Sequence, residues 1–188
     1  VLLGSANAIE QIIYEGRSLS QVLDALDPKL RPAIQSVTFA ALRSWAHAQK
    51  RIQKLVPKKP SKEVDLLLSV SCTLILGQER GDMQNRYPAH TIVNEAVKAA
   101  GSSPKTQFAQ GLINAVLRKI AVSSKDEDLV GQGFGIAFPR WWLEQLQAAY
   151  PKEWQGICIE QGKRPPLVLR INTNKISLID YCALLESK

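Results

Sequence analysis

The sequence predicts an all-α helical bundle followed by the beginning of a small α/β segment. Three observations support this prediction. Across residues 5–120, apolar side chains recur at spacings of three and four, which is the period of helices that bury one face. Residues 123–128 are small and charged, and three glycines follow between 131 and 135, so the helical pattern stops there. Further on, residues 167–172 are apolar and rich in β-branched side chains, which is typical of a strand.

In the first half of the bundle we expect helices at about residues 5–15, 18–26 and 31–56. Gly16 suits the end of the first helix, because glycine readily adopts the conformation that stops one. Ser18 and Gln21 have the spacing of a capping box at the start of the second. A fourth helix is expected to begin after Ser61. Its apolar residues lie nearly all round, so we predict that it is the central, buried helix.

Two further helices, at about residues 88–100 and 108–120, are predicted to form a hairpin. We expect the second helix to bury an apolar stripe made of Phe108, Leu112, Ala115, Val116 and Ile120. Asn94 and Asn114 lie inside these helices, where asparagine is a poor helix former. We interpret them as buried amides that bond the backbone of a neighbouring helix, because a buried amide is costly unless it is paired. Direct contact with a ligand is the alternative.

The expected domain organisation has three parts. Residues 1–122 form the helical domain, residues 123–138 a linker, and residues 139–188 the beginning of the α/β segment. One strand cannot form a sheet alone, so the partners of residues 167–172 are expected after Lys188 or in another chain. The sequence begins with valine and ends without a helix stop, so we expect a piece of a longer protein.

Composition limits the class of protein. The chain has 188 residues, of which 45% are hydrophobic and 22% charged, so it can bury a core. Three cysteines, without a C-x-x-C pair, indicate a reducing compartment, and we expect a cytoplasmic protein. The longest apolar run, residues 66–76, is too short to span a membrane, and we expect no membrane partner.

Basic residues are the strongest functional signal. The chain carries a net charge of +7, and the 21 residues from Arg43 to Glu63 contain seven basic residues and one acid. Lys50, Arg51 and Lys54 are spaced so that they are expected to share one helix face. Such a face can bind the RNA backbone, or it can simply be solvated. The candidate RNA-binding residues are Arg43, Lys50, Arg51, Lys54, Lys58, Lys59, Lys62, Arg118, Lys119, Arg164 and Arg170.

Catalytic and metal-binding patterns are weak. The two histidines, His47 and His90, are too few for a histidine metal site, and the cysteines do not have metal-ligand spacing. No glycine-rich loop follows a strand, as a nucleotide-binding site would need. We therefore expect no catalytic, cofactor-binding or metal-binding residue in this chain.

The two hairpin helices carry a resemblance to a known family. The pattern P-A-H-x-x-V-N-E-A-V, followed by G-L-I-N-A-V-L-R, resembles the helices of the NusB-like RNA-binding fold. The version L-I-N-A-V-L-R-K-I, together with P-x-W-W-L and P-x-x-L-R-x-N further on, resembles the N-terminal region of the bacterial small-subunit rRNA cytosine-5 methyltransferase B (Fmu/Sun) family. One departure is that the first helix lacks the early arginine expected of this family.

This resemblance implies an RNA-binding region that positions small-subunit rRNA for methylation. The resembled enzymes use S-adenosylmethionine and a cysteine nucleophile that follows a proline. None of Cys72, Cys158 and Cys182 follows a proline, so no catalytic residue is carried over to this chain. Two alternatives stay open at this point: an antitermination factor of the NusB type that binds RNA, and a helical protein-interaction module. The oligomeric state is not indicated by the sequence.

We predict that this chain by itself neither binds S-adenosylmethionine nor methylates RNA, because it lacks both the nucleotide loop and the nucleophile. Isothermal titration calorimetry of residues 1–188 with S-adenosylmethionine should show no binding heat. A micromolar dissociation constant would contradict this prediction.

Overall fold

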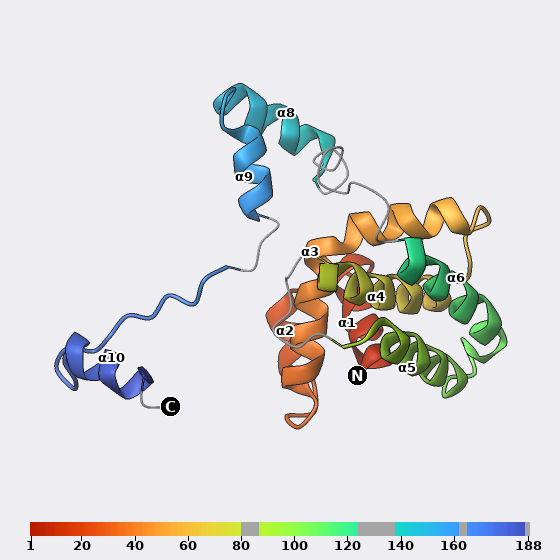
Figure 1. Ribbon diagram of the computed structural model, residues 1–188, viewed down its shortest axis with the longest axis horizontal. Coiled ribbons are helices and arrows are strands. Elements are labelled where there is room, and N and C mark those ends of the chain that lie inside the picture. The colour runs from red at the N-terminus through yellow and green to blue at the C-terminus, as the bar shows by residue number, and fades with distance from the viewer. Residues whose placement is uncertain (80–86, 124–137, 162–164, 187–188) are drawn as a thin grey trace.

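The computed structural model describes residues 1–79, 87–123, 138–161 and 165–186. In chain order its elements are α1 (Leu2–Ile13), α2 (Leu19–Asp24), α3 (Arg31–Leu55), α4 (Lys62–Glu79), α5 (Ala89–Gly101), the 3₁₀ helix η1 (Gln107–Ala109), α6 (Gln110–Ser123), α8 (Arg140–Ala149), α9 (Trp154–Gln161) and α10 (Leu178–Glu186) (Figure 1). Within the described residues no strand is present, so the prediction of an all-α bundle is confirmed there. None of the helices in these ranges has the length and apolarity needed to cross a membrane.

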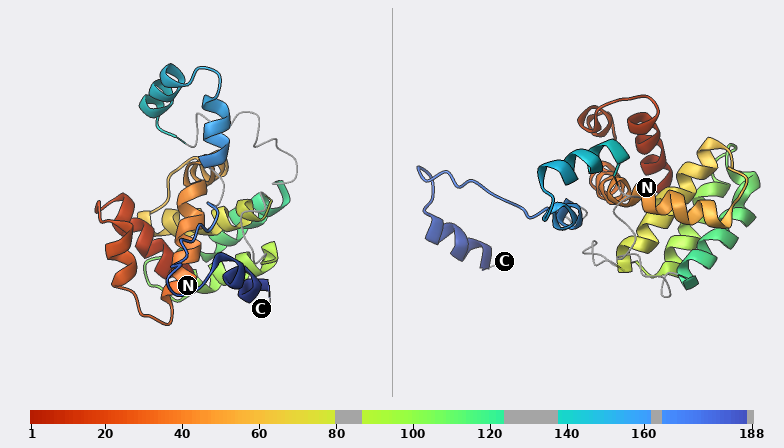
Figure 2. Two further views of the ribbon diagram at one scale, coloured as in Figure 1. Left: turned by 90° about the vertical axis from the view of Figure 1, so that its left-hand side faces the viewer. Right: turned by 90° about the horizontal axis from the view of Figure 1, so that it is seen from above.

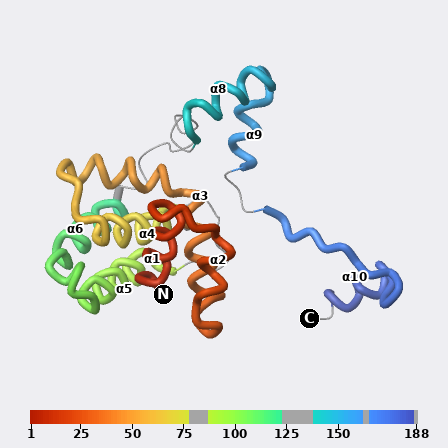
Figure 3. The backbone as a smooth tube through the Cα atoms, turned by 180° about the vertical axis from the view of Figure 1, so that it is seen from behind, coloured from red at the N-terminus to blue at the C-terminus, as the bar shows by residue number. Residues whose placement is uncertain are grey.

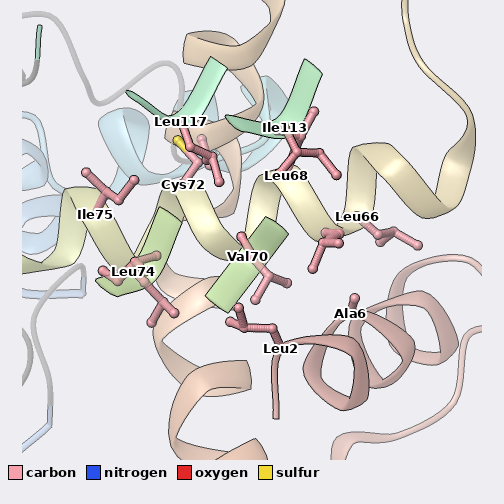
Figure 4. Close-up of a cluster of buried hydrophobic side chains, with 14 of the residues drawn as sticks. Leu2, Ala6, Leu66, Leu68, Val70, Cys72, Leu74, Ile75, Ile113 and Leu117 are labelled. Atoms are coloured by element: carbon pink, nitrogen blue, oxygen red, sulfur yellow. The ribbon is translucent and has the colours of Figure 1, made fainter. Parts of the chain in front are cut away.

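Helix α4 is the centre of the bundle, as the sequence predicts. Helices α1, α3, α5 and α6 all pack against it, and Figure 3 shows them around it from the opposite side. Every residue from Val64 to Leu76 is buried. In Figure 4, Leu68 and Cys72 of α4 lie close to Ile113 and Leu117 of α6. The core is therefore built around a helix that has no solvent-facing side over most of its length.

Three hydroxyl side chains are buried in α4, and each is satisfied within the helix itself. Ser69 donates to the carbonyl of Asp65 at 2.7 Å, Ser71 to that of Leu67 at 2.8 Å, and Thr73 to that of Val70 at 2.7 Å. A buried hydroxyl without a partner would cost stability, so these bonds allow the polar residues to sit inside an apolar core.

The predicted start of α2 is confirmed. The Ser18 hydroxyl accepts a hydrogen bond from the Gln21 backbone N–H at 3.3 Å, and the Gln21 side chain accepts one from the Ser18 N–H at 3.2 Å. Gly16, just before this cap, has a φ of +68°, a left-handed conformation that glycine adopts at little cost. These two features turn the chain sharply between α1 and α2.

The hairpin of α5 and α6 forms as predicted, but of the apolar stripe predicted for its second helix only Val116 and Ile120 are buried. Phe108 is 74% exposed and Leu112 is 38% exposed. The buried stripe consists of Ala109, Ile113, Val116, Leu117 and Ile120. The side of α6 that packs against α4 and α5 carries this second stripe, so tertiary contacts decide which residues are buried. Both stripes have the three-and-four spacing, so the periodicity could not distinguish them.

The interpretation of Asn94 as a buried amide is wrong. Its side chain is exposed on α5. Asn114 is half-buried, but its carbonyl accepts a hydrogen bond at 3.1 Å from the Nε of Arg118 on its own helix, not from the backbone of a neighbouring one. Neither amide is thus needed to fix the packing of two helices.

The strand predicted at residues 167–172 is also not observed. These residues are extended but are not part of a sheet (Figure 2). Leu167 and Val168 are more than 80% exposed. A strand needs a neighbour to accept its backbone hydrogen bonds, and no other strand exists among the described residues. The next helix, α10, is capped at its start, since the Ser177 hydroxyl accepts from the Asp180 N–H at 3.1 Å. Most of the predicted linker, residues 124–137, lies outside the described residues.

We predict that Leu117→Ala destabilises the protein far more than Leu112→Ala does. Leu117 is fully buried against α4, so removing its side chain leaves a cavity and should cost about 2–5 kcal/mol. Leu112 is partly exposed on the same helix and should cost less than about 1 kcal/mol. Urea unfolding monitored by circular dichroism measures both values. Equal losses would mean that the observed phase of α6 is incorrect.

Candidate nucleic-acid interface

Five exposed lysines gather where α3 ends and α4 begins. Lys50 and Lys54 lie on the last turns of α3, Lys58 and Lys59 in the connection, and Lys62 at the start of α4. We call these five residues the lysine loop. The short connection between two packed helices keeps them within one part of the surface (Figure 1). Such a group of ammonium charges suits phosphate contacts.

Arg51 does not share the exposed face expected for it. Only 6% of this residue is accessible, whereas Lys50 and Lys54 on either side are exposed. Residues one apart on a helix differ by about 100° in direction, so a neighbour in sequence can point into the bundle. The long stem of Arg51 therefore belongs to the packing of α3, and this arginine is not positioned as a phosphate contact.

Two lysines of the lysine loop form ion pairs with acids from outside the basic segment. The Lys62 ammonium lies 2.5 Å from a carboxylate oxygen of Glu10 on α1, and Lys59 lies 3.7 Å from Asp65. Hydrogen bonding to Glu10 and the charge of its carboxylate raise the pKa of Lys62. Among the described residues, Lys50 and Lys58 have no such partner. The local positive charge is thus weaker than the sequence alone indicates.

A sixth cation joins this end of the bundle from a distant part of the chain. The ammonium of Lys105, in the turn between α5 and α6, lies 3.6 Å from Glu63 at the start of α4. The pKa of Glu63 is lowered first by a backbone hydrogen bond at the start of the helix and then by the charges of Lys105 and Lys62. This contact brings the α5–α6 turn beside the lysine loop, which no local sequence pattern could indicate.

The other candidate cations lie elsewhere. Arg118 and Lys119 are exposed on α6, about two helical turns, or about 12 Å of helix, after that helix begins at Gln110. Arg170 is exposed in the extended chain before α10. Arg164 lies outside the described residues. The eleven residues predicted from sequence therefore do not form one continuous strip.

Arg43 lines a separate surface groove. This groove of about 1270 Å³ lies between the start of α1, the first half of α3 and α5, and its walls include Leu3, Phe39, Tyr87 and Ile92. Arg43 is half-buried, and its Nε has no hydrogen-bond partner among the residues that the structure describes. Arg43 lies seven residues before Lys50 on α3, which is about 10 Å of helix, and it lines this groove.

The described residues contain little that could support catalysis or metal binding. Within them, no group of three or more histidine, cysteine, aspartate or glutamate side chains converges. His47 is buried in the bundle, and His90 is exposed at the start of α5. Cys72 and Cys158 are buried thiols, and burial raises the pKa of Cys158, which makes it a poorer nucleophile.

Two family profiles match the chain in succession. Residues 5–122 match the NusB family. Residues 138–188 match a family described as Methyltr_RsmF/B-like, ferredoxin-like domain. The first match covers α1 to α6, and the second covers α8 to α10.

Several curated proteins are similar over nearly the whole chain. The ribosomal RNA small subunit methyltransferase B of Cronobacter sakazakii is 32% identical over 192 residues, covering 97% of this chain and 43% of that protein. The probable ribosomal RNA small subunit methyltransferase B of Coxiella burnetii is 32% identical over 188 residues, covering 98% of this chain and 42% of that protein. The ribosomal RNA small subunit methyltransferase B of Klebsiella pneumoniae is 31% identical over 194 residues, covering 97% of this chain and 42% of that protein. The chain thus spans less than half the length of these relatives.

The adjacent residues Lys50 and Arg51 provide a test of the interface geometry. We predict that Arg51→Ala lowers the free energy of unfolding by about 1–3 kcal/mol, because it removes a buried stem and leaves its partners unsatisfied. Lys50→Ala should change it by less than about 0.5 kcal/mol, because the side chain is exposed. Denaturant unfolding of both variants measures the difference. If Arg51→Ala leaves the free energy of unfolding unchanged, the side chain of Arg51 is exposed and not buried.

Proposed function

Because the chain belongs to the NusB family over residues 5–122, we propose that it is the RNA-binding N-terminal region of an rRNA (cytosine-5-)-methyltransferase. Its role would be to position small-subunit rRNA for methylation. The observation that carries this proposal is the order of the two family matches, a NusB domain followed by the RsmF/B-like ferredoxin-like segment. The names of the similar bacterial proteins support the same reading.

The proposal accounts for the chain better than the two alternatives. An antitermination factor of the NusB type would explain α1 to α6 but leaves the match at residues 138–188 without a role. A helical protein-interaction module would explain neither that match nor the excess of lysine over acid at one end of the bundle. The protein-interaction reading makes a distinct prediction about salt, which the experiment below uses.

In this proposal the domains have separate tasks. Residues 1–122 would bind RNA. Residues 123–138 would form the linker to residues 139–188, which begin the α/β segment that leads to a catalytic part. That part would supply the cysteine nucleophile and use S-adenosylmethionine as the methyl donor, in the cytoplasm. This chain itself would contribute binding and orientation only. Its extended residues 167–172 would find their strand partners in the rest of the parent protein.

The lysine loop is the surface that we assign to the RNA backbone. Phosphate groups lie at regular spacing along RNA, and ammonium groups that neutralise them release counterions. Lys50 and Lys58 are the clearest contacts, because neither is paired with an acid among the described residues. Lys59 and Lys62 would have to exchange Asp65 and Glu10 for phosphate, which reduces their net gain.

We predict that the double variant Lys50→Gln/Lys58→Gln binds RNA less tightly and with a weaker dependence on salt. Each phosphate contact contributes a log–log slope of roughly −0.7 to −0.9, so losing two should flatten the slope by about 1.4–1.8 units. The measurement is fluorescence anisotropy of a labelled small-subunit rRNA hairpin, titrated at several potassium chloride concentrations.

The matched control is Lys29→Gln, which removes an exposed charge from the turn between α2 and α3, at the other end of α3 from the lysine loop. The control should keep the wild-type slope within about 0.3 units, because a distant surface charge is screened within about 10 Å. If the lysine-loop variant and the control have the same slope, the lysine loop is not the RNA surface. If the wild-type chain shows only weak binding that disappears above low salt, the protein-interaction reading is favoured.

A further inference from the structure

The two asparagines of the hairpin lie on its outer surface, and the packing of the bundle does not account for them. Asn94 is exposed and makes no hydrogen bond within the described residues. Asn114 uses only its carbonyl oxygen, which accepts from the Arg118 Nε at 3.1 Å. Asparagine lowers helix stability relative to most residues, so two of them in neighbouring helices need another explanation.

The register of the hairpin brings these residues opposite each other. The Gln110 side-chain amide donates to the carbonyl of Val97 at 3.3 Å, which fixes where α6 crosses α5. Because the two helices run in opposite directions, Asn94 on α5 and Asn114 on α6 lie at the same level, one helical turn further from the hairpin turn. Val93 and Ile113, the residues beside them, are buried. The asparagines therefore flank the outer side of the α5–α6 contact.

Another turn along, the same outer side carries His90 on α5 and Arg118 on α6. Both are exposed, and the terminal nitrogens of Arg118 make no bond to any described residue. We call His90, Asn94, Asn114 and Arg118 the amide seam. It is rich in unused hydrogen-bonding groups: a whole amide, an amide NH₂, an imidazole and a guanidinium fork.

The charges around the amide seam are compatible with an RNA ligand. Helix α6 contains no acidic residue at all. The one acid of α5, Glu95, is paired with Lys98 at 2.9 Å. Arg118 and the adjacent Lys119 leave the neighbourhood positive, so phosphates are not repelled.

We propose that the amide seam reads the base edges of unpaired nucleotides in the bound RNA. This inference rests on the proposed function, because it assumes that RNA is the partner. An asparagine amide can form a two-point contact with N6 and N7 of adenine, and an arginine fork can do so with O6 and N7 of guanine. Sequence-specific RNA recognition favours single-stranded regions, where those edges are accessible. The amide seam would thus supply sequence preference, and the lysine loop would supply affinity without it.

The test uses an RNA pool with ten randomised nucleotides, selected on residues 1–188 and sequenced. The wild type should enrich adenine-containing sequences. The best selected RNA is then compared with a copy whose enriched adenines are replaced by cytosine. Wild-type protein should prefer the selected RNA, and Asn94→Ala/Asn114→Ala should lose roughly 5- to 100-fold of that preference. The salt slope should be unchanged, since amides release no counterions.

Two controls keep the outcome interpretable. Asn7→Ala, at the exposed asparagine of α1, should keep the full preference. The thermal melt of the double variant Asn94→Ala/Asn114→Ala should match that of the wild type, because the side chains removed are not buried in the core.

Failures of this inference and of the proposed function are distinguishable. If the wild type enriches no motif, or if the seam double variant keeps the wild-type preference, the amide seam does not read bases, while the lysine-loop result stands. If the wild type does not bind the pool or the rRNA hairpin at all, the proposed function itself fails.

Discussion

The burial of α4 on all sides is the constraint on which the rest of the structure depends. A helix with no solvent-facing side needs neighbours around its whole circumference, and α1, α3, α5 and α6 provide them. The polar groups inside must then be satisfied locally, as Ser69, Ser71 and Thr73 are by carbonyls of α4 itself. Burying the apolar side chains of α4 stabilises the fold by about 25 cal/mol for each Å² of apolar area removed from water.

The position of the lysine loop follows from the beginning of this helix. Asp65 is buried in the first turn of α4, and Gln49 of α3 reaches both its carboxylate and the hydroxyl of Ser69. Lys59 balances the same carboxylate from the surface. These contacts tie the end of α3 to the start of α4, so the lysines between them are presented on a fixed part of the fold. The buried carboxylate of Asp65 thus holds the lysines of this surface in place. In the sequence alone, Asp65 counts only as one negative charge near the basic segment.

Much of the fold could be predicted from the sequence, because the relevant signals are local. The cap at Ser18, the stop at Gly16 and the all-round apolar character of α4 each depend on a few adjacent residues. The buried side of α6 could not be predicted, because two stripes have equal spacing and the packing against α4 and α5 selects between them. The burial of Arg51 and the exposure of Asn94 depend on which side of a helix meets its neighbour. The pairing of Lys62 with Glu10, 52 positions earlier, and of Lys105 with Glu63 depends on tertiary contacts, as does the absence of a strand partner for residues 167–172.

The structure separates two kinds of polar surface, and this separation has a physical consequence for recognition. The phosphate contacts proposed for the lysine loop would act through counterion release, which is insensitive to base identity and weakens as salt rises. The hydrogen bonds proposed for the asparagines of the amide seam would depend on which base is presented and little on salt. The pair of Lys105 with Glu63 brings the α5–α6 turn beside the lysine loop, whereas the amide seam lies further along the same hairpin. An RNA that spans both surfaces would be held by its backbone at one end of the bundle and identified by its bases along the hairpin. In the proposed role of positioning rRNA, this arrangement would make affinity depend on ionic strength, while the asparagines would determine the register of the bound strand.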